Sequence, residues 1–476
     1  MISKKDFTKI NDYLWEIPSS FRNNMKVPAR IYASDKILED SFEDESINQL
    51  INTATLPGAF KYVLAMPDIH EGYGPPIGGV IATEYPTGAI SPGAIGFDQN
   101  CGVRLLLSNY QFQDIKNNLE KLATEIQNQV PSGLGQGRQQ KTSMEEMDKI
   151  LNFGSKHLVE SGFGEKNDLE NCESFGSLKT ADSSEVSPHA KQRGRDQVGT
   201  LGSGNHFLEI QKVAEIFNQE IAAKFGLFKD QIVVMIHTGS RGLGHQICTD
   251  YLRVMVSAIE KYKIKLPDRE LACVPFNSEE GQKFFKAMCC GANFAWANRQ
   301  MISYYVRKAW KMALGAGKDL KLLYDVAHNI AKIEEHFGKK LIVHRKGATR
   351  AFPSNHPELP KKYKETGQPV IIPGSMGTAS YILAGINTGQ DSFFSTNHGA
   401  CRKMSRKSAT RNFSGGKIVS DLSQKGIIVK CKSYRGIAEE APQAYKDIDE
   451  IVDVVHKAGL SKKVAKLVPL AVIKGE

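Results

Sequence analysis

The chain has 476 residues, 41% of them hydrophobic, and its 42 glycines and 19 prolines are ordinary numbers for a packed globular protein. No apolar run reaches the roughly 18 residues of a membrane span, and the opening MISKKDFTKINDYLW has no apolar signal core. We therefore expect no membrane association and a cytoplasmic location. The formal net charge of +10 favours polyanionic partners, and the length suits two or three average domains or one large one.

Four segments carry apolar residues at helical spacing, and each is predicted to be a helix: residues 112–130, 213–226, 245–262 and 278–314. The stretch 163–190 is polar and rich in serine, which predicts a surface loop or an insertion. We find no internal repeat and no low-complexity tract.

Short apolar strands run between these helices, and polar residues stand at several of their ends. QIVVMIHTGSRGLGH passes from a β-branched run into His237 and a glycine-rich turn, and QPVIIPGSMGTASYIL runs into a turn that holds Ser375. In VGTLGSGNHFLEI the order is reversed, because Asn205 and His206 precede the strand. This alternation predicts a mixed core of strands and helices with a site at one edge.

Three histidines and the segment GFDQNCGVRL, residues 96–105, provide a candidate set of metal ligands. His206, His237 and His328 each lie where an apolar segment meets a polar turn, and Asp98 and Cys101 stand between glycines. Taken singly, each has a structural interpretation, since a buried cysteine packs as a small apolar residue and Asp beside Gly is common in turns. Together they suit a borderline ion such as Zn²⁺, Mn²⁺, Co²⁺ or Fe²⁺, and a thiolate can bridge two ions. Two neighbouring ions suit phosphoryl chemistry.

A basic run, STNHGACRKMSRKSATRNF at residues 395–413, has no acidic member. It is open to two interpretations, a solvated basic loop or a surface for a polyanion. His398 stands at its head, and a neutral imidazole can attack phosphorus while neighbouring cations hold the charge. Arg193, Arg195 and Arg241 are expected to extend the positive surface.

Nine motifs, in one order from residue 66 to residue 475, resemble those of the RtcB family of RNA-splicing ligases: MPDIHEGYGPPIGGV, DQNCGVR, GTLGSGNHFLEI, HTGSRGLGH, DVAHN, HRKGATRAFP, PGSMGTASYIL, HGACRKMSR and AVIKG. The resemblance implies an α+β fold with a mixed β-sheet core, flanking helices and an active site in a central cleft, as a single catalytic domain over residues 1–476. It implies a ligase that depends on GTP and Mn²⁺ and joins an RNA 3′-phosphate or 2′,3′-cyclic phosphate end to a 5′-hydroxyl end, in tRNA splicing or RNA repair. Archease is the activating partner that it suggests.

The resemblance also implies roles for individual residues. Cys101 would bridge two Mn²⁺ ions, with Asp98 and His206 completing one site and His237 and His328 the other. His398 would attack the α-phosphate of GTP to give a histidine–GMP intermediate. The guanylate contacts would be Asn205, Glu209, Ser375, Ser380, Tyr445 and Lys474. The RNA phosphates would fall to Arg193, Arg195, Arg241 and Arg406. Asp68 is a further active-site candidate without an assigned role.

The sequence departs from the family pattern at one position, and two functions other than a ligase are also open. The family usually reads H-G-A-G-R where this chain reads HGACR, so Cys401 replaces a glycine and would strain or shift the loop if positive φ is needed there. A two-metal phosphoesterase or nuclease would need the metal residues but not His398, Glu209 or Lys474. A non-catalytic RNA-binding protein would leave the metal residues without a purpose.

Overall fold

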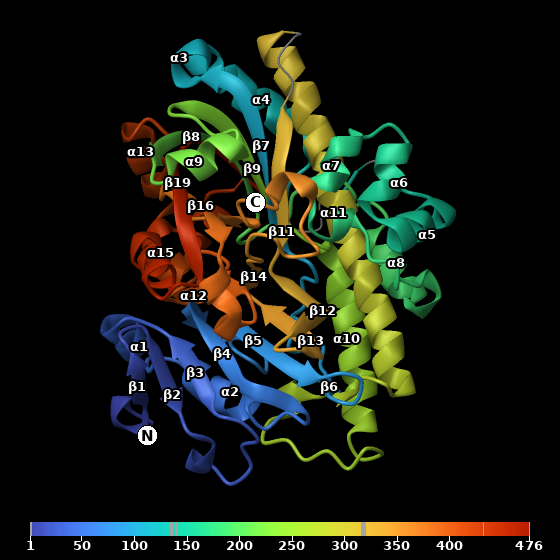
Figure 1. Cartoon of the computed structure of the whole chain (residues 1–476). Coiled ribbons are helices and arrows are strands. Elements are labelled where there is room, and N and C mark those ends of the chain that lie inside the picture. The colour runs from blue at the N-terminus through green and yellow to red at the C-terminus, as the bar shows by residue number, and fades with distance from the viewer. Residues whose placement is uncertain (1, 134–136, 139–140, 316–319, 432, 476) are drawn as a thin grey trace.

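The computed structural model describes residues 2–133, 137–138, 141–315, 320–431 and 433–475. Two large sheets organise the chain, one above the other in Figure 1. The lower sheet has seven strands in the order β1-β2-β3-β4-β5-β13-β12: Thr8–Asn11, Leu14–Ile17, Ala29–Tyr32, Ala59–His70, Ile77–Glu84, Lys339–Lys346 and Asn329–His336. The upper sheet has eight in the order β11-β7-β9-β8-β19-β16-β15, with β18 beside β19: Lys321–Ala327, Gly102–Gln111, Gln231–Thr238, Phe207–Ile216, Ser461–Lys474, Ser380–Gly385, Pro369–Ile372 and Ile428–Lys430.

Two short strand pairs join these sheets to the rest of the chain: β6 (Ala89–Ile90) with β10 (Val274–Pro275), and β14 (Ala348–Arg350) with β17 (Ser395–Asn397). Among the described strands, β3 with β4 and β18 with β19 are parallel and the other pairs are antiparallel. Segregated antiparallel sheets and helices confirm the α+β class expected from the resemblance. Both sheets combine strands that are distant in sequence, and the single catalytic domain over residues 1–476 stays a prediction.

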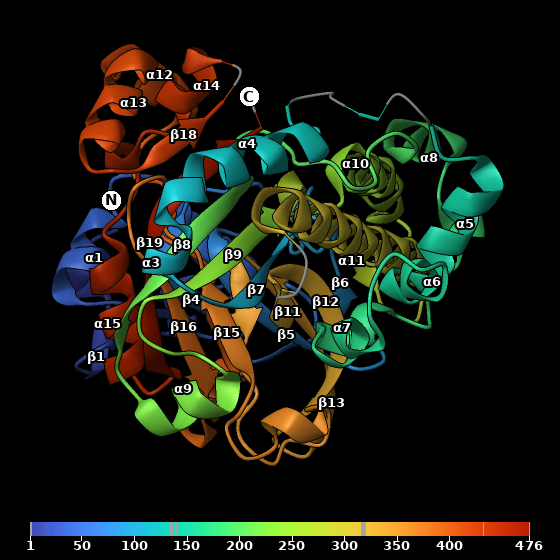
Figure 2. The same cartoon turned by 90° about the horizontal axis from the view of Figure 1, so that it is seen from above.

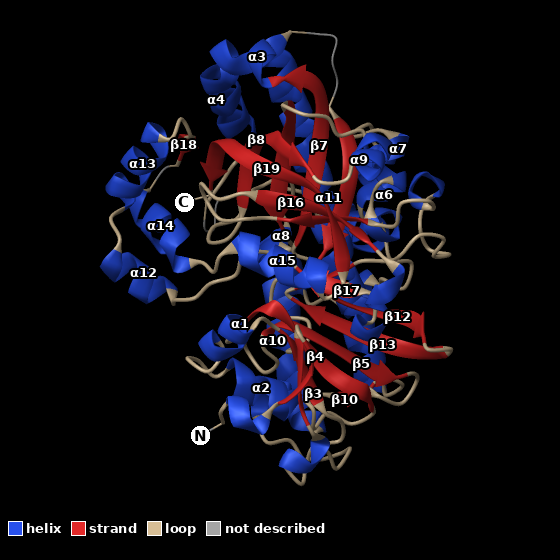
Figure 3. Ribbon diagram, turned by 60° about the vertical axis from the view of Figure 1, so that its left-hand side comes forward, coloured by secondary structure: helices blue, strands red, loops and turns tan. Residues whose placement is uncertain are grey.

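Helices cover the outer faces of the sheets (Figures 2 and 3). They are α1 Asp35–Asp40, α2 Ser46–Thr53, α3 Phe112–Ile115, α4 Leu119–Gln129, α5 Met144–Phe153, α6 Ser155–Glu160, α7 Lys166–Glu170, α8 Pro188–Gly194, α9 Gln219–Phe225, α10 Arg241–Ala258, α11 Glu279–Leu314, α12 Arg406–Asn412, α13 Gly415–Gln424, α14 Tyr434–Glu439 and α15 Ile448–Lys457. Helices α12, α13 and α14 project at one side of the molecule, beside β18. No helix of the described residues is both long enough and apolar enough to cross a membrane.

The upper sheet is buried on both faces, which explains the unbroken apolar run of β9. Val234 and Ile236 pack with α4 and α11 on one face, whereas Val233 and Met235 pack under α9 on the other. A third cluster lies between the two sheets, where Leu64 of β4 meets residues of β15, β16 and α15. The strands that hold the site described below are therefore packed on both faces.

Two local expectations differ from the structure. Residues 213–216 belong to strand β8, where they pair with β19, and the helix α9 begins only after the N-cap Asn218. The stretch 163–190 holds α7, two 3₁₀ turns and the start of α8 rather than a plain surface loop. Its Glu173 is fully buried and pairs with Lys332 and Arg350. A polar composition suggests exposure, but these polar groups are buried with partners.

Candidate active site

Four neighbouring strands of the upper sheet bring the predicted metal ligands together. Cys101 directly precedes β7, His237 lies near the end of β9, His206 directly precedes β8, and His328 directly follows β11. Since β11, β7, β9 and β8 are adjacent and antiparallel in turn, these four positions meet at one edge of the sheet. The backbone N–H of His328 donates to the carbonyl of Cys101 at 2.9 Å, which ties two of the positions directly.

The turn that carries Asp98 and Cys101 is anchored from behind by α11. The Arg299 guanidinium donates to the carbonyls of Asn100 and Thr238, both at 2.8 Å, and is paired with the buried carboxylate of Asp325. Asn100 has a φ of 52°, which an asparagine tolerates better than most residues. The Asp98 carbonyl accepts from the Cys101 N–H at 3.0 Å, closing the turn. Buried polar contacts thus fix the backbone on which the ligands stand.

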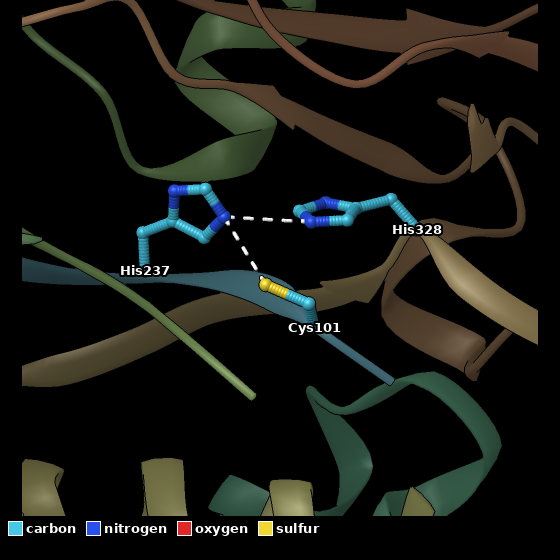
Figure 4. Close-up of side chains that lie close together, drawn as sticks. All are labelled: Cys101, His237 and His328. Atoms are coloured by element: carbon cyan, nitrogen blue, oxygen red, sulfur yellow. Dashed lines mark hydrogen bonds between the residues drawn. The ribbon is translucent and has the colours of Figure 1, made fainter. Parts of the chain in front are cut away.

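Cys101 lies between two imidazoles. Its Sγ is 3.4 Å from Nε2 of His206 and 3.4 Å from Nε2 of His237. His206 Nε2 is also 2.8 Å from Oδ2 of Asp98, and His237 Nε2 is 3.4 Å from Nε2 of His328. Figure 4 shows the His237 and His328 rings pointing toward each other above the thiol. The five ligand atoms form two groups, Asp98–Cys101–His206 and Cys101–His237–His328, and Cys101 belongs to both.

The protonation states of this cluster suit metal binding. Burial and the neighbouring histidines hold the pKa values of His237 and His328 well below the usual range, so both rings are neutral and carry a lone pair. Burial alone would raise the pKa of Asp98, but the hydrogen bond and charge of His206 lower it. Nε2 is the nitrogen that each of these two rings turns toward the cluster, whereas Nδ1 of both rings is buried without a hydrogen-bond partner among the described residues. The mixed N, O and S donor set fits two borderline divalent ions that share one thiolate.

His398 lies beside this cluster and is oriented by Asp68. The ring follows β17, and its centroid is 4.8 Å from that of His328. Oδ2 of the fully buried Asp68 is 2.7 Å from Nδ1 of His398 and accepts the backbone N–H of the same residue at 2.9 Å. Burial would raise the pKa of Asp68, yet His398 lowers it, through its positive charge when protonated and through its hydrogen bonds, so the carboxylate is ionised. An ionised carboxylate accepts the proton of Nδ1 and leaves the lone pair on Nε2.

A cavity of about 700 Å³ opens over both groups, and four of the six predicted guanylate contacts line it: Asn205, Ser375, Tyr445 and Lys474. Glu209 and Ser380 lie beneath the lining and are joined by Gln211, whose Nε2 donates to both at 2.7 and 3.0 Å. Burial raises the pKa of Glu209 to about 8, and its Oε1 has no hydrogen-bond partner among the described residues.

The four predicted RNA-contacting arginines occupy different environments. Arg406, at the start of α12, lines the cavity and pairs with Glu440 at 3.3 Å. Arg193 and Arg195 lie on or beside α8, away from the cavity lining. Arg241 does not extend a positive surface as expected, because it is buried and donates to Thr200 Oγ1 and the Gly133 carbonyl.

Two further residues of the cavity wall, Lys346 and Glu440, were not predicted as site residues, and Arg402 was predicted only as one cation of the basic run. Lys346 is buried, and burial lowers its pKa to about 7. Arg402 and Glu440 pair at 3.1 Å, and Glu440 also accepts from the hydroxyl of Tyr445. Lys346 follows His344 and Arg345 at the end of an apolar run, which was its available signal. Glu440 had none, because EEAPQAY reads as an ordinary polar segment.

Known proteins resemble the whole chain. The family described as tRNA-splicing ligase RtcB matches residues 49–475. A tRNA-splicing ligase RtcB of Thermococcus kodakarensis is 50% identical over 475 residues, covering 98% of each chain. One from Archaeoglobus fulgidus is 51% identical over 475 residues, again 98% of each chain. An RNA-splicing ligase RtcB of Mycobacterium tuberculosis is 48% identical over 434 residues, covering 90% of this chain and all of its own. Together with the site geometry, these matches confirm the resemblance seen in the motifs, and the chain belongs to the RtcB family.

Proposed function

We propose that this protein, an RNA ligase of the tRNA-splicing RtcB family, joins an RNA 3′-phosphate or 2′,3′-cyclic phosphate end to a 5′-hydroxyl end with GTP and two Mn²⁺ ions. The observation that carries the proposal is the position of Cys101 Sγ, 3.4 Å from two imidazoles and shared by two groups of ligands, with His398 beside them. Two ions held by Asp98, Cys101, His206, His237 and His328 would neutralise phosphate charge.

His398 is the proposed nucleophile. Asp68 holds the proton of Nδ1, so the lone pair of Nε2 forms the bond to the α-phosphorus of GTP and pyrophosphate leaves. The ring gains positive charge in this step, and the Asp68 carboxylate stabilises that charge. Arg402, Arg406 and Lys474 line the same cavity and are available to the phosphates.

The later steps pass GMP to the RNA. Where the RNA end is cyclic, it is first hydrolysed to a 3′-phosphate. The 3′-phosphate then takes GMP from His398, and the 5′-hydroxyl of the second RNA attacks this phosphate, so that GMP leaves as the strands are joined. Asn205, Ser375 and Tyr445 are proposed to hold the guanylate at the cavity wall, with Glu209 and Ser380 beneath them. Arg193, Arg195 and Arg406 remain the proposed contacts to RNA, archease the proposed activating partner, and the cytoplasm the proposed location.

The test is ligation of two RNA strands, one ending in a 3′-phosphate and one beginning with a 5′-hydroxyl, with GTP and Mn²⁺. Wild-type protein should join them, and His398→Ala should not. His189→Ala removes an exposed histidine on α8, outside the cavity, and should ligate at the wild-type rate. If His398→Ala still joins the strands, or if both proteins only cleave phosphate esters, the ligase mechanism is wrong and a two-metal phosphoesterase remains.

A further inference from the structure

A third group of potential metal ligands lies beside the two that share Cys101. It consists of Asp68, His398 and Cys401. Cys401 Sγ is 3.7 Å from Oδ2 of Asp68 and 3.7 Å from each of the two ring nitrogens of His398, Nδ1 and Nε2. Cysteine stands at position 401, where the resemblance implies glycine, and its φ of 52° lies in the left-handed region that favours glycine. This cysteine places a sulfur ligand directly beside the proposed nucleophile.

The separations of these three atoms match the face of a tetrahedral zinc site. Bonds of about 2.3 Å to sulfur, 2.0 Å to nitrogen and 2.0 Å to oxygen place the sulfur roughly 3.5 Å from the other two ligand atoms, which themselves lie about 3.3 Å apart. The observed distances are 3.7, 3.7 and 2.7 Å. The ion would be admitted if the contact between Asp68 and His398 opened by about half an ångström and the ring turned so that Nδ1 rather than Nε2 faced the sulfur.

The surroundings also suit a bound cation. Asp68 is fully buried, and its Oδ1 has no hydrogen-bond partner among the described residues, so an oxygen is available in addition to the one that holds His398. One carboxylate and one thiolate balance the two positive charges of the ion, which lowers the free-energy cost of burying the complex. His398 and Cys401 both line the cavity, from which the ion and a water ligand can enter. The backbone of Cys401 is held by its carbonyl, which accepts the N–H of Lys446 at 2.9 Å.

We propose that Asp68, His398 and Cys401 form a third metal site, selective for Zn²⁺ over Mn²⁺, and that zinc bound there blocks the nucleophile. A thiolate ligand favours the softer ion. Binding releases the thiol proton to solvent and takes the lone pair of Nδ1, so the one remaining proton of the neutral ring moves to Nε2. No lone pair is then left on Nε2 to bond to phosphorus. The binding step stands on geometry alone, whereas the inhibition rests on the proposed role of His398.

Binding is tested with Co²⁺, whose bonds to thiolates give a charge-transfer band in the near ultraviolet. Cys101→Ser removes the shared thiolate, so the band that remains should come from Cys401 and should disappear in the double variant Cys101→Ser, Cys401→Gly. Equilibrium dialysis of the full chain with Zn²⁺ provides a second measurement that needs no change at Cys101. It should give three ions per wild-type chain and two for Cys401→Gly. Equal stoichiometries, or a band independent of Cys401, would overturn the proposal.

Inhibition is tested by the covalent labelling of the protein from α-³²P-labelled GTP in Mn²⁺ with increasing Zn²⁺. The zinc concentration that halves labelling should rise at least tenfold in Cys401→Gly, because one of the three protein ligands is gone. Cys431→Ser is the control, since it alters a half-buried thiol outside the cavity, and it should leave this zinc concentration unchanged. Labelling without zinc tests His398 separately. If labelling occurs and the same zinc concentration halves it in wild type, Cys401→Gly and Cys431→Ser, the inhibitory site is refuted while the proposed function stands. If no protein is labelled but Cys401-dependent zinc binding persists, the metal site stands and the proposed function fails.

Discussion

Replacing Asp68 with asparagine removes a negative charge on which several donors converge. Oδ2 lies 2.7 Å from Nδ1 of His398, 2.9 Å from the backbone nitrogen of His398 and 3.3 Å from that of Gly399. The amide of asparagine has one carbonyl oxygen, which can accept from the same donors. Asp68→Asn should therefore keep the loop, the tautomer of His398 and both metal groups, and lose only the charge.

The size of the effect follows from the positive charge that, in the proposed mechanism, His398 gains when Nε2 bonds to phosphorus. A unit charge 2.7 Å from the carboxylate is worth about 6 kcal/mol at an effective dielectric constant of 20. The positive charge is spread over the ring, and about half of it lies farther from Oδ2, which leaves roughly 3 kcal/mol. Loss of this stabilisation corresponds to a rate of covalent GMP formation about 100-fold lower.

The assay is the rate of covalent labelling from α-³²P-labelled GTP, with bound metal measured on the same sample. Asp44→Asn is the matched control, because Asp44 is an exposed carboxylate at the rim of the same cavity and should label at nearly the wild-type rate. A rate for Asp68→Asn within threefold of wild type, with metal retained, would show that Asp68 does not stabilise the charge on His398.

Further predictions concern the guanine contact, the RNA surface and the buried support of the site. Glu209 has a pKa of about 8, and in the proposed contact it must be ionised to accept two donors from guanine. Guanosine affinity should therefore rise about tenfold per pH unit from pH 6 to 8 and then level off. Glu209→Gln should show no such slope in calorimetry. Arg406→Ala should weaken RNA binding and reduce the slope of log affinity against log salt by about 1. Asp325→Ala should destabilise the protein by about 3–5 kcal/mol in urea denaturation, because Arg104 and Arg299 would stay buried without their carboxylate; a loss below 1 kcal/mol would contradict that account.

The candidate ligand cluster could be predicted from the sequence because its cysteine and its three histidines lie at or next to strand ends. His206, His237 and His328 stand at the ends of apolar runs, and adjacent strands bring such ends together. The contact between Asp68 and His398 could not be predicted. These residues are 330 positions apart in the chain, and the packing of β4 near β17 brings them together. The role of Arg299 could not be predicted either, because it is one of many polar residues in the 36-residue helix α11.

Buried polar residues account for most of the remaining differences. The sequence of 163–190 suggested an exposed loop because polar side chains are usually exposed, whereas Asp168 and Glu173 are buried against cations. Arg241 was expected on the surface for the same reason. Composition gives the polarity of a side chain. Whether that side chain can be buried depends on a hydrogen-bond or ion-pair partner that comes from a distant part of the chain.

The most direct test of the central claim is mass spectrometry of the protein after incubation with GTP and Mn²⁺. The account predicts that the intact chain gains the mass of one GMP, that the adduct lies on His398, and that both His398→Ala and Cys101→Ser lose it. Cys101→Ser should also lose bound Mn²⁺ from both ligand groups. A GMP adduct on another residue, or a full adduct in Cys101→Ser, would contradict the assignment of His398 as nucleophile and Cys101 as the shared metal ligand.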